Sequence, residues 1–215
     1  MNIYLLKIPE QLTFSNIEPY LSFVSDARRE TILRYVPEDA RIRSLLAALL
    51  VRYGIRTDLH LQNADLTFDK NEYGKPFLYG HANYHFSLSH SGKYVAFASG
   101  DAPIGIDVER RKEGRDNIAG RFFTSSEAQY AADNGLAGFY EVWTKKEAYV
   151  KFLGTGFSTS ISSFDVFTDL GVSLVAKQLD GYTLSICCKK ALPDSLPIME
   201  VNFTQLCRLF PLPVN

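Results

Sequence analysis

The stretch Ile-Gly-Ile-Asp-Val-Glu at positions 104–109 alternates apolar and polar residues with a period of two. This period is typical of a β-strand with one buried face, so the three branched apolar residues are predicted to face a core. Asp107 and Glu109 then share the other face, about 6.6 Å apart along the strand. Carboxylates at this spacing can bind one divalent cation, and oxygen ligands favour Mg²⁺, with Mn²⁺ as the alternative ion. A strand end whose acids simply face water fits the same pattern.

The rest of the chain mixes helical and strand patterns without a regular βαβ order, which favours an α+β fold. Leucines at a period of about 3.6 residues predict a long helix that opens at Pro37. Further helices are predicted at 25–35, 124–132 and 138–152. Strands are predicted at 2–8, 84–88, 94–99, 103–108, 163–167, 172–177, 182–188 and 197–203. We expect an N-terminal subdomain of residues 1–103 and a C-terminal subdomain of residues 104–215.

Composition excludes several classes of protein. The chain has 215 residues and a formal net charge of −1, which argues against a polybasic nucleic-acid binder. The N-terminus lacks the pattern of a signal peptide, and no apolar run approaches the ~20 residues of a membrane span, so we expect a cytoplasmic protein with no membrane partner. Cys187, Cys188 and Cys207 are an odd number without metal-site spacing, and they are predicted to be buried small apolar residues.

The predicted helix 138–152 carries a second polar group. Trp143, Glu147 and Lys151 follow one another at intervals of four residues, which places them on one face of a helix. Trp143 is the only tryptophan of the chain, and a carboxylate and an amine beside it indicate a partly buried face. The alternative is an ordinary surface Glu–Lys pair, worth about 0.3–0.5 kcal/mol.

Two further groups indicate an anion site. Ser89, His90 and Ser91 are neighbours at the end of a predicted strand, and neighbours in a strand point apart, so a Ser–His nucleophilic triad is not favoured. Hydroxyls and an imidazole that face a bound anion fit better, with a structural histidine as the alternative. Positions 26–56 also hold seven arginines against four acids, and a subset of these arginines converging on a phosphate would use the fork geometry of the guanidinium.

Five blocks occur in sequence order: Gly74-Lys75-Pro76, Ser89-His90-Ser91, the strand 105–109, Arg121-Phe122-Phe123 with Glu127, and the helix segment 143–151. Together they resemble the Sfp-type 4′-phosphopantetheinyl transferases, from about residue 28 to residue 157. The resemblance implies a pseudo-twofold pair of similar α+β subdomains with the cofactor cleft between them. It also implies an enzyme that transfers the 4′-phosphopantetheine group of coenzyme A to a serine of an apo acyl or peptidyl carrier protein, releasing adenosine 3′,5′-bisphosphate.

The resemblance implies roles for individual residues. The ligands of Mg²⁺ would be Asp107, Glu109 and Glu147. The contacts to coenzyme A would come from Arg28, Arg43, Ser44, Lys75, Ser89, His90, Asp107 and Lys151. As catalytic residues, Glu147 would take the proton of the serine hydroxyl, directly or through water, and Lys151 would neutralise the phosphate left on the nucleotide. Thr31 departs from the pattern because relatives can carry a second basic residue there, so the groups that complete the 3′-phosphate site stay open.

The carrier protein is expected to dock beside the metal strand. The segment 110–115 holds four basic residues among six, and with Ile118, Phe122 and Phe123 it would receive an acidic carrier. A solvated loop is the alternative. The helix segment 143–151 resembles the branch of polyketide and nonribosomal peptide pathways, with fatty-acid carriers as the other option. Two fused halves imply a monomer.

Two other functions are weighed. A Mg²⁺-dependent nuclease or phosphohydrolase would suit Asp107 and Glu109, but a nuclease of the (D/E)xK kind needs lysine at position 111, where this chain has Arg111. A non-catalytic coenzyme A-binding module would use the same cleft, and the presence of Glu147 and Lys151 together argues against it.

Overall fold

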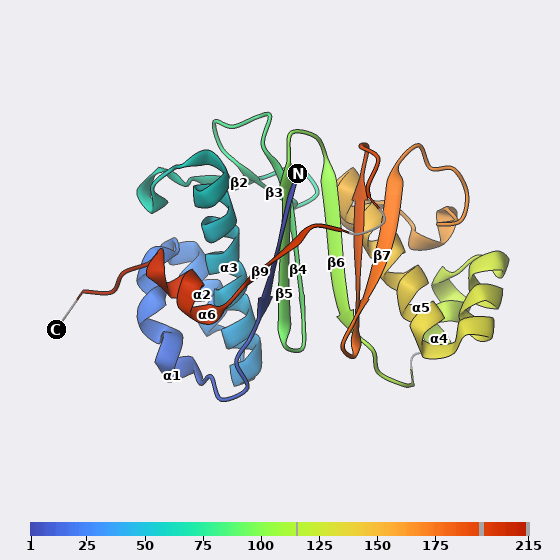
Figure 1. Cartoon of the computed structure of the whole chain (residues 1–215), viewed down its shortest axis with the longest axis horizontal. Helices are drawn as coiled ribbons and strands as arrows, with labels where there is room; N and C mark the ends of the chain where they lie inside the picture. The colour runs from blue at the N-terminus through green and yellow to red at the C-terminus, as the bar shows by residue number, and fades with distance from the viewer. Residues whose placement is uncertain (115, 194–195, 214–215) are drawn as a thin grey trace.

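The computed structural model describes residues 1–114, 116–193 and 196–213. Two parts lie side by side, each a sheet covered on its outer face by a long helix (Figure 1). Helix α3 (Glu38–Leu59) covers the first sheet and helix α5 (Ser125–Leu153) covers the second. The order of layers is therefore helix, sheet, sheet, helix. The predicted α+β fold, with two similar halves, is confirmed.

The first sheet has the strand order β4-β5-β1-β9. Strand β1 (Asn2–Lys7) lies between β5 (Tyr94–Gly100) and β9 (Ile198–Val201), antiparallel to β5 and parallel to β9. Strand β4 (His85–Ser91) forms the edge toward the second half. The four central residues of β1 are all buried because the strand has a layer on each face: Tyr4 and Leu6 pack against α3, whereas Ile3 and Leu5 pack against the second sheet. A strand covered on both faces is apolar throughout rather than alternating.

Short elements surround this sheet: α1 (Phe14–Ile17), the 3-10 turns Glu18–Phe23 and Asn63–Asp65, α2 (Asp26–Leu33), the hairpin of β2 (Phe68–Lys70) and β3 (Pro76–Leu78), and α6 (Phe203–Arg208). In the turn between β2 and β3, Gly74 supplies the positive φ of 86° that the backbone requires. Ser25 caps α2 by accepting a hydrogen bond from the backbone of Arg28.

The second sheet has the order β6-β8-β7, from β6 (Ile104–Arg110), β7 (Ser173–Leu179) and β8 (Tyr182–Cys188). Helix α4 (Asp116–Phe122) leads into α5, which Thr124 and Glu127 start with a capping box. The two helices predicted at 124–132 and 138–152 are joined within α5 across a kink at Gly135, whose φ is 57°. The strand predicted at 163–167 is wrong, because a 3-10 turn at Ile161–Ser163 and an irregular segment stand there instead.

The C-terminal segment returns to the first half, where β9 pairs with β1 and α6 contacts α3. The division into residues 1–103 and 104–215 stays a prediction. The structure shows that β9 and α6, which belong to the second range, pack on the first half. Cys187 and Cys188 are buried free thiols as predicted, whereas Cys207 is partly exposed. None of the helices in the described part of the chain has the length and apolar character needed to cross a membrane.

Candidate active site

Strand β6 has two different faces, as its sequence predicts. Ile104, Ile106 and Val108 are at most 1% exposed and pack into the core between the two sheets. The opposite face carries Gly105 and Asp107 and lies under helix α5. A Cβ atom at Gly105 would lie 1.9 Å from the carbonyl oxygen of Ala148, so only glycine allows this close approach. The glycine thereby brings the helix that carries Glu147 and Lys151 down onto the acidic face of the strand.

Asp107 is the most enclosed acid of this face, with its side chain 4% exposed. Its Oδ1 accepts hydrogen bonds from Ser89 Oγ at 2.7 Å and from Lys151 Nζ at 2.6 Å. Its Oδ2 is buried and has no hydrogen-bond partner among the described residues. A buried carboxylate oxygen left without a donor is costly, which indicates a place for a further cation or donor.

Two of the three serines of β4 face the acids of β6. Ser91 Oγ donates to Glu109 Oε2 at 2.7 Å, as Ser89 does to Asp107, and Ser87 Oγ accepts from the backbone N–H of Ile106 at 3.1 Å. Alternate residues of one strand therefore join the two halves through side chains. The hydroxyls of Ser89 and Ser91 were predicted to face a bound anion. In this structure they donate to carboxylates, and their contact with an anion stays a prediction.

Glu147 lies close enough to both acids of β6 to interact with them electrostatically. Burial raises the pKa of Glu147, and the negative charges of Asp107 and, more weakly, Glu109 raise it further, while Lys151 opposes the shift. Three negative charges from β6 and α5 thus repel one another across a small space, and a divalent cation would relieve that repulsion.

The donor set fits Mg²⁺ or Mn²⁺ in chemistry, because it offers carboxylate oxygens and one of them, Asp107 Oδ2, is buried and unpartnered. No three His, Cys, Asp or Glu side chains in the described ranges are already grouped as the ligands of a metal ion, and the ammonium of Lys151 occupies Asp107 Oδ1. A cation shared by Asp107, Glu109 and Glu147 therefore remains a prediction.

The basic residues expected at coenzyme A gather around the end of β4. Arg28 Nη2 donates to both the backbone carbonyl and the hydroxyl of Ser44 at 3.0 Å, which holds α2 against α3. Arg43 forms an ion pair with Asp39 at 2.6 Å. Enclosure by the protein lowers the pKa of His90, and the cations Arg43, Lys151 and Arg28 lower it further. Arg43, Lys151 and Arg28 therefore all lie close enough to the His90 imidazole to interact with it electrostatically.

Lys75 joins the two halves. Its ammonium donates to the backbone carbonyls of Ile104 at 3.1 Å and Lys151 at 2.5 Å, and burial lowers the pKa of Lys75 to about 8. Asn71 Nδ2 donates to the carbonyl of Gly154 at 2.8 Å. The β2–β3 turn therefore caps the C-terminus of α5, satisfying carbonyls that a helix end leaves free. This role of Asn71 was missed, because its only local signal was that of a turn residue.

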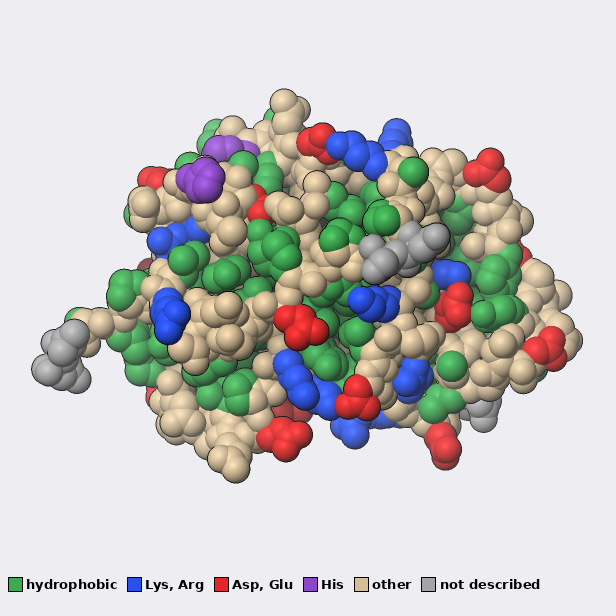
Figure 2. Space-filling view, viewed as in Figure 1, with side chains coloured by type: hydrophobic (Ala, Val, Ile, Leu, Met, Phe, Trp, Pro, Cys, Tyr) green, Lys and Arg blue, Asp and Glu red, His purple; other side chains and the backbone are tan. Residues whose placement is uncertain are grey.

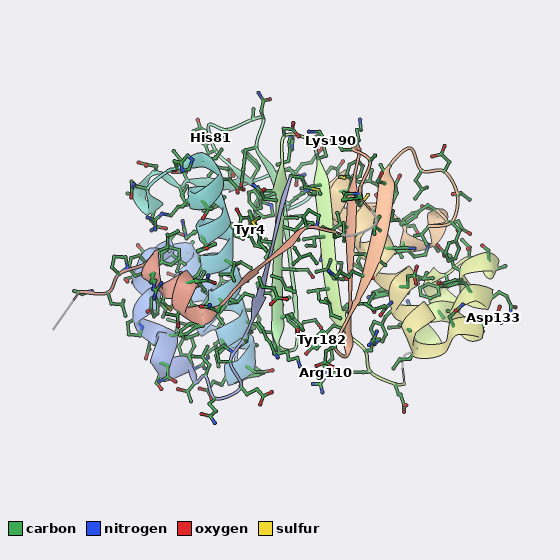
Figure 3. All side chains as sticks on the ribbon, viewed as in Figure 1. Tyr4, His81, Arg110, Asp133, Tyr182 and Lys190 are labelled. Atoms are coloured by element: carbon green, nitrogen blue, oxygen red, sulfur yellow. The ribbon has the colours of Figure 1, made fainter. Side chains whose placement is uncertain are left out.

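Two cavities are lined by residues of both halves, and another lies beside them within the N-terminal half. One of about 670 Å³ is lined by Lys75, Phe122, Glu147, Lys151, Gly156 and residues 158–161. A second, of about 480 Å³, continues it across Pro76, Phe86 and Leu88 toward α2 and α3. A third, of about 820 Å³, lies at the other end beside Arg43, His90 and Arg110. Figure 2 shows basic and acidic side chains mixed along the lower edge of the junction, near Arg110 and Tyr182 of Figure 3.

Family models match both halves of the chain. The model described as 4′-phosphopantetheinyl transferase superfamily matches residues 103–193. The model described as 4′-phosphopantetheinyl transferase, N-terminal, matches residues 11–102. The two matches meet at the junction on which the candidate site lies.

Similar proteins cover most of the chain. The 4′-phosphopantetheinyl transferase gsp of Aneurinibacillus migulanus is 33% identical over 222 residues, which cover 95% of this chain and 93% of that protein. The 4′-phosphopantetheinyl transferase Sfp of Bacillus subtilis (strain 168) is 35% identical over 77% of this chain and 76% of its own length. The L-aminoadipate-semialdehyde dehydrogenase-phosphopantetheinyl transferase of Saccharomyces cerevisiae is 30% identical over 74% of this chain and 62% of its own length.

Proposed function

The chain belongs to the 4′-phosphopantetheinyl transferase superfamily and transfers the 4′-phosphopantetheine group of coenzyme A to a carrier protein, and from that premise we propose that Asp107, Glu147 and Lys151 perform the reaction. The observation that carries the proposal is Asp107, a buried carboxylate with a cation on one oxygen and, within the described ranges of the chain, no donor on the other. Such a group suits a site that binds a charged ligand better than it suits a structural ion pair, in which both oxygens would be satisfied.

Asp107, Glu109 and Glu147 would hold Mg²⁺, with Mn²⁺ as the alternative. When bound, the cation supplies Lewis-acid neutralisation of the diphosphate charge. The support is the oxygen-only donor set and the raised pKa of Glu147, which burial and then the negative charges of Asp107 and Glu109 produce.

Glu147 is the proposed base. Its raised pKa makes its carboxylate a stronger proton acceptor than an ordinary surface glutamate, and its place on the wall of the 670 Å³ cavity gives an incoming serine hydroxyl access to it. The proton leaves the serine oxygen for the Glu147 carboxylate as that oxygen attacks the phosphorus. Lys151, one turn further along α5, then donates to the phosphate oxygen that leaves on the nucleotide.

Coenzyme A would contact Arg28, Arg43, Ser44, Lys75, Ser89, His90, Asp107 and Lys151. The support is the cationic surrounding of His90 and the cavities that run from Lys151 toward Arg28. Phosphates need positive charge, and arginine supplies it in a geometry that matches phosphate oxygens.

The carrier, an acyl or a peptidyl carrier protein, would dock on segment 110–115 with Ile118, Phe122 and Phe123, and a single chain would bind it. Arg115 lies outside the described residues. Arg110 and Lys112 are exposed, whereas the guanidinium of Arg111 donates to Gln178 and to the carbonyl of Leu179. An acidic partner therefore has Arg110 and Lys112 as its most accessible cations.

Mass spectrometry tests the proposal. The protein is incubated with coenzyme A, Mg²⁺ and an apo carrier, and the carrier is expected to gain about 340 Da, the mass of a phosphopantetheine group on its serine. The Glu147→Gln variant, incubated in parallel, is expected to give no measurable gain in the same time. Hydrolysis of coenzyme A without a mass gain would favour a phosphohydrolase, and binding without turnover would favour a non-catalytic module, either of which would overturn the proposal.

A further inference from the structure

Tyr182 is a buried phenol that the proposed site has not yet used. It begins β8 directly opposite Arg110 of β6, at the lower end of the junction in Figure 3, and is 4% exposed. It lines the 820 Å³ cavity together with His90, one of the residues proposed to contact coenzyme A. Tyr182 belongs to the second half, but its side chain contacts the loop between β4 and β5 in the first half.

The phenol oxygen of Tyr182 is a hydrogen-bond partner for the backbone of that loop. The last pair of the β4–β5 ladder is Ser91 with Tyr94, so Gly92 and Lys93 form a two-residue loop outside the ladder. The backbone N–H of Lys93 donates to Tyr182 Oη at 2.9 Å. Backbone groups that leave a ladder need another partner, and here the other half of the molecule provides one.

The loop also fits closely around the Tyr182 side chain. Gly92 has a φ of 51°, and a Cβ atom there would lie 2.1 Å from Tyr182 Oη. Both the left-handed backbone and the approach of the phenol therefore require glycine at this position. The rings of Tyr94 and Tyr182 meet edge-on with 4.8 Å between their centroids, and Lys93 Nζ forms an ion pair with Asp180 at 3.4 Å. The start of β8 thus holds the loop through its backbone, a ring and a charge.

The position of this loop affects the site, because the residues just before it are site residues. Ser91 Oγ donates to Glu109 Oε2 at 2.7 Å and accepts the backbone N–H of Arg110 at 3.1 Å. His90 is the neighbour of Ser91 in β4, so a shift of the loop would move both side chains. Tyr182 pairs with Arg110 across the ladder, which fixes the loop and the end of β6 to the same residue.

We propose that Tyr182 is a positioning residue for coenzyme A binding, which holds the β4–β5 loop so that His90 and Ser91 lie at the junction of the halves. This inference rests on the proposed function, because it takes coenzyme A as the ligand of His90. Tyr182 acts through the loop rather than on the reacting atoms. Loss of its hydroxyl should therefore weaken coenzyme A binding more than it slows the transfer at saturation.

Calorimetric titration with coenzyme A tests the positioning role. Tyr182→Phe keeps the ring and removes the acceptor of the Lys93 N–H, and it is expected to bind coenzyme A about 2- to 10-fold more weakly, the range of one lost hydrogen bond. Its kcat for carrier loading at saturating coenzyme A should stay within about 2-fold of the parent. The matched control is Tyr4→Phe, because Tyr4 is 3% exposed and its hydroxyl donates to Asp58, near the other end of the first sheet. Tyr4→Phe is expected to lower Tm and to leave the dissociation constant of coenzyme A unchanged.

Double variants test whether Tyr182 acts through the loop. Gly92→Ala is expected to weaken coenzyme A binding about 10-fold in the parent, because the new Cβ atom meets Tyr182 Oη. The same substitution should cost less in Tyr182→Phe, where that oxygen is absent, while the backbone strain is common to both proteins. In a His90→Ala background, which lacks the positioned imidazole, Tyr182→Phe should change the affinity by less than about 2-fold.

Several results would overturn the inference. If Tyr182→Phe behaves like Tyr4→Phe, with a lower Tm and an unchanged dissociation constant, Tyr182 has a structural role only. Additive effects of Gly92→Ala and Tyr182→Phe would show that the phenol does not hold the loop, and a full effect of Tyr182→Phe on top of His90→Ala would show that it contacts the ligand itself. The two proposals fail separately: a parent that binds coenzyme A without loading a carrier loses the proposed function while the binding comparison still decides the role of Tyr182, whereas a parent that loads a carrier and binds coenzyme A no better than Tyr182→Phe loses this inference alone. A parent that does not bind coenzyme A loses both.

Discussion

Asp107 Oδ1 accepts hydrogen bonds from Lys151 and Ser89, whereas Oδ2 has no partner in the part of the chain that the structure describes. This difference assigns the two oxygens different roles in the proposed site. Lys151 contacts Oδ1, whereas the predicted metal ion would bind Oδ2. Removing the lysine and removing the carboxylate should therefore have different kinetic consequences.

We expect Lys151→Ala to lower kcat by about 10²–10³ while changing the Mg²⁺ dependence little, because the lysine stabilises charge that develops during transfer. Asp107→Ala should lower kcat and also raise the Mg²⁺ concentration that gives half-maximal rate. Initial rates of carrier loading over a Mg²⁺ series, measured for both variants, check the split. An unchanged Mg²⁺ dependence in Asp107→Ala would refute the ligand assignment.

Lys75 gives a prediction of pH dependence. Burial lowers its pKa from 10.5 to about 8 in the folded protein, so between pH 8 and 10.5 the unfolded chain binds more protons than the folded chain. Stability then rises with pH across this window, by at most about 1.4 kcal/mol per pH unit. The Lys75→Met variant lacks this contribution, while all other groups titrate alike in both proteins.

Urea unfolding at pH 7, 8, 9 and 10 measures the effect as a difference. The free energy of unfolding of the parent, minus that of Lys75→Met, should grow as the pH rises from 8 to 10. Parallel curves over that range would mean that the amine is already solvated in the folded state.

Sequence patterns predicted some positions of individual residues in the site and missed others. Alternation in β6 correctly placed Asp107 and Glu109 opposite the apolar residues, because the period of a strand is local. The partners of Lys75 could not be found in this way, since the carbonyls of Ile104 and Lys151 reach it only through tertiary packing. The alternation also places Gly105 on the polar face. It does not show that this position must be glycine, because the atom that a Cβ would meet belongs to α5, about 40 residues later in the chain.

At the scale of elements, α5 is fixed by a buried ion pair. Lys146 Nζ lies 2.8 Å from Glu127 Oε2, and both side chains are 0% exposed. Lys146 also donates to the carbonyls of Ile161 and Phe164, and Glu127 Oε1 accepts the backbone N–H of Val166. The pair therefore holds Ile161, which lines the 670 Å³ cavity, and the residues that follow it against α5.

Lys146→Met should lower the free energy of unfolding by about 3–5 kcal/mol, because it leaves the carboxylate of Glu127 buried without its cation. The matched control is Lys190→Met, whose ion pair with Asp101 is more than half exposed on both sides and which should change stability by less than about 1 kcal/mol. Urea unfolding of both variants measures the difference. Equal effects would show that Lys146 is neutralised or hydrated rather than paired.

The same pair explains the strand predicted at 163–167 that the structure lacks. The stretch has strand-forming residues, but two of its backbone groups bind the side chains of Glu127 and Lys146, which lie far away in the sequence. A strand needs those groups for a neighbouring strand. In contrast, the boundaries of β8 and the start of the long helix at residue 38 follow local signals and agree closely with prediction.

At the scale of the whole molecule, the structure contains the two predicted halves. The contacts that connect them were not predicted. The pairing of β1 with β9 joins Ile3 to Ile198, and no local sequence pattern predicts a contact between residues so far apart in the chain. The joint between β4 and β6 is likewise made by serine side chains rather than by a backbone ladder. Two of the cavities are lined by residues of both halves, so the site depends on contacts that sequence periodicity does not encode.

A carrier must approach this joint from outside, and its approach should depend on charge. Lys112 is exposed beside the junction, and the net charge of the whole chain is only −1, so local charge rather than overall charge would attract an acidic carrier. Lys112→Glu should raise the KM for the carrier about 3- to 10-fold at low salt and leave the KM for coenzyme A unchanged. The control Arg208→Glu makes the same charge change on α6, away from the junction, and should leave both constants unchanged.

Salt distinguishes docking by charge from docking by apolar contact. The Debye length falls from about 30 Å at 0.01 M salt to about 10 Å at 0.1 M, so the carrier KM of the parent should rise over this range while that of Lys112→Glu rises less. Carrier loading at several salt concentrations, with coenzyme A saturating, measures both slopes. If the parent's KM is independent of salt, Ile118, Phe122 and Phe123 hold the carrier by burial alone, and the exposed basic residues after β6 form an ordinary solvated loop.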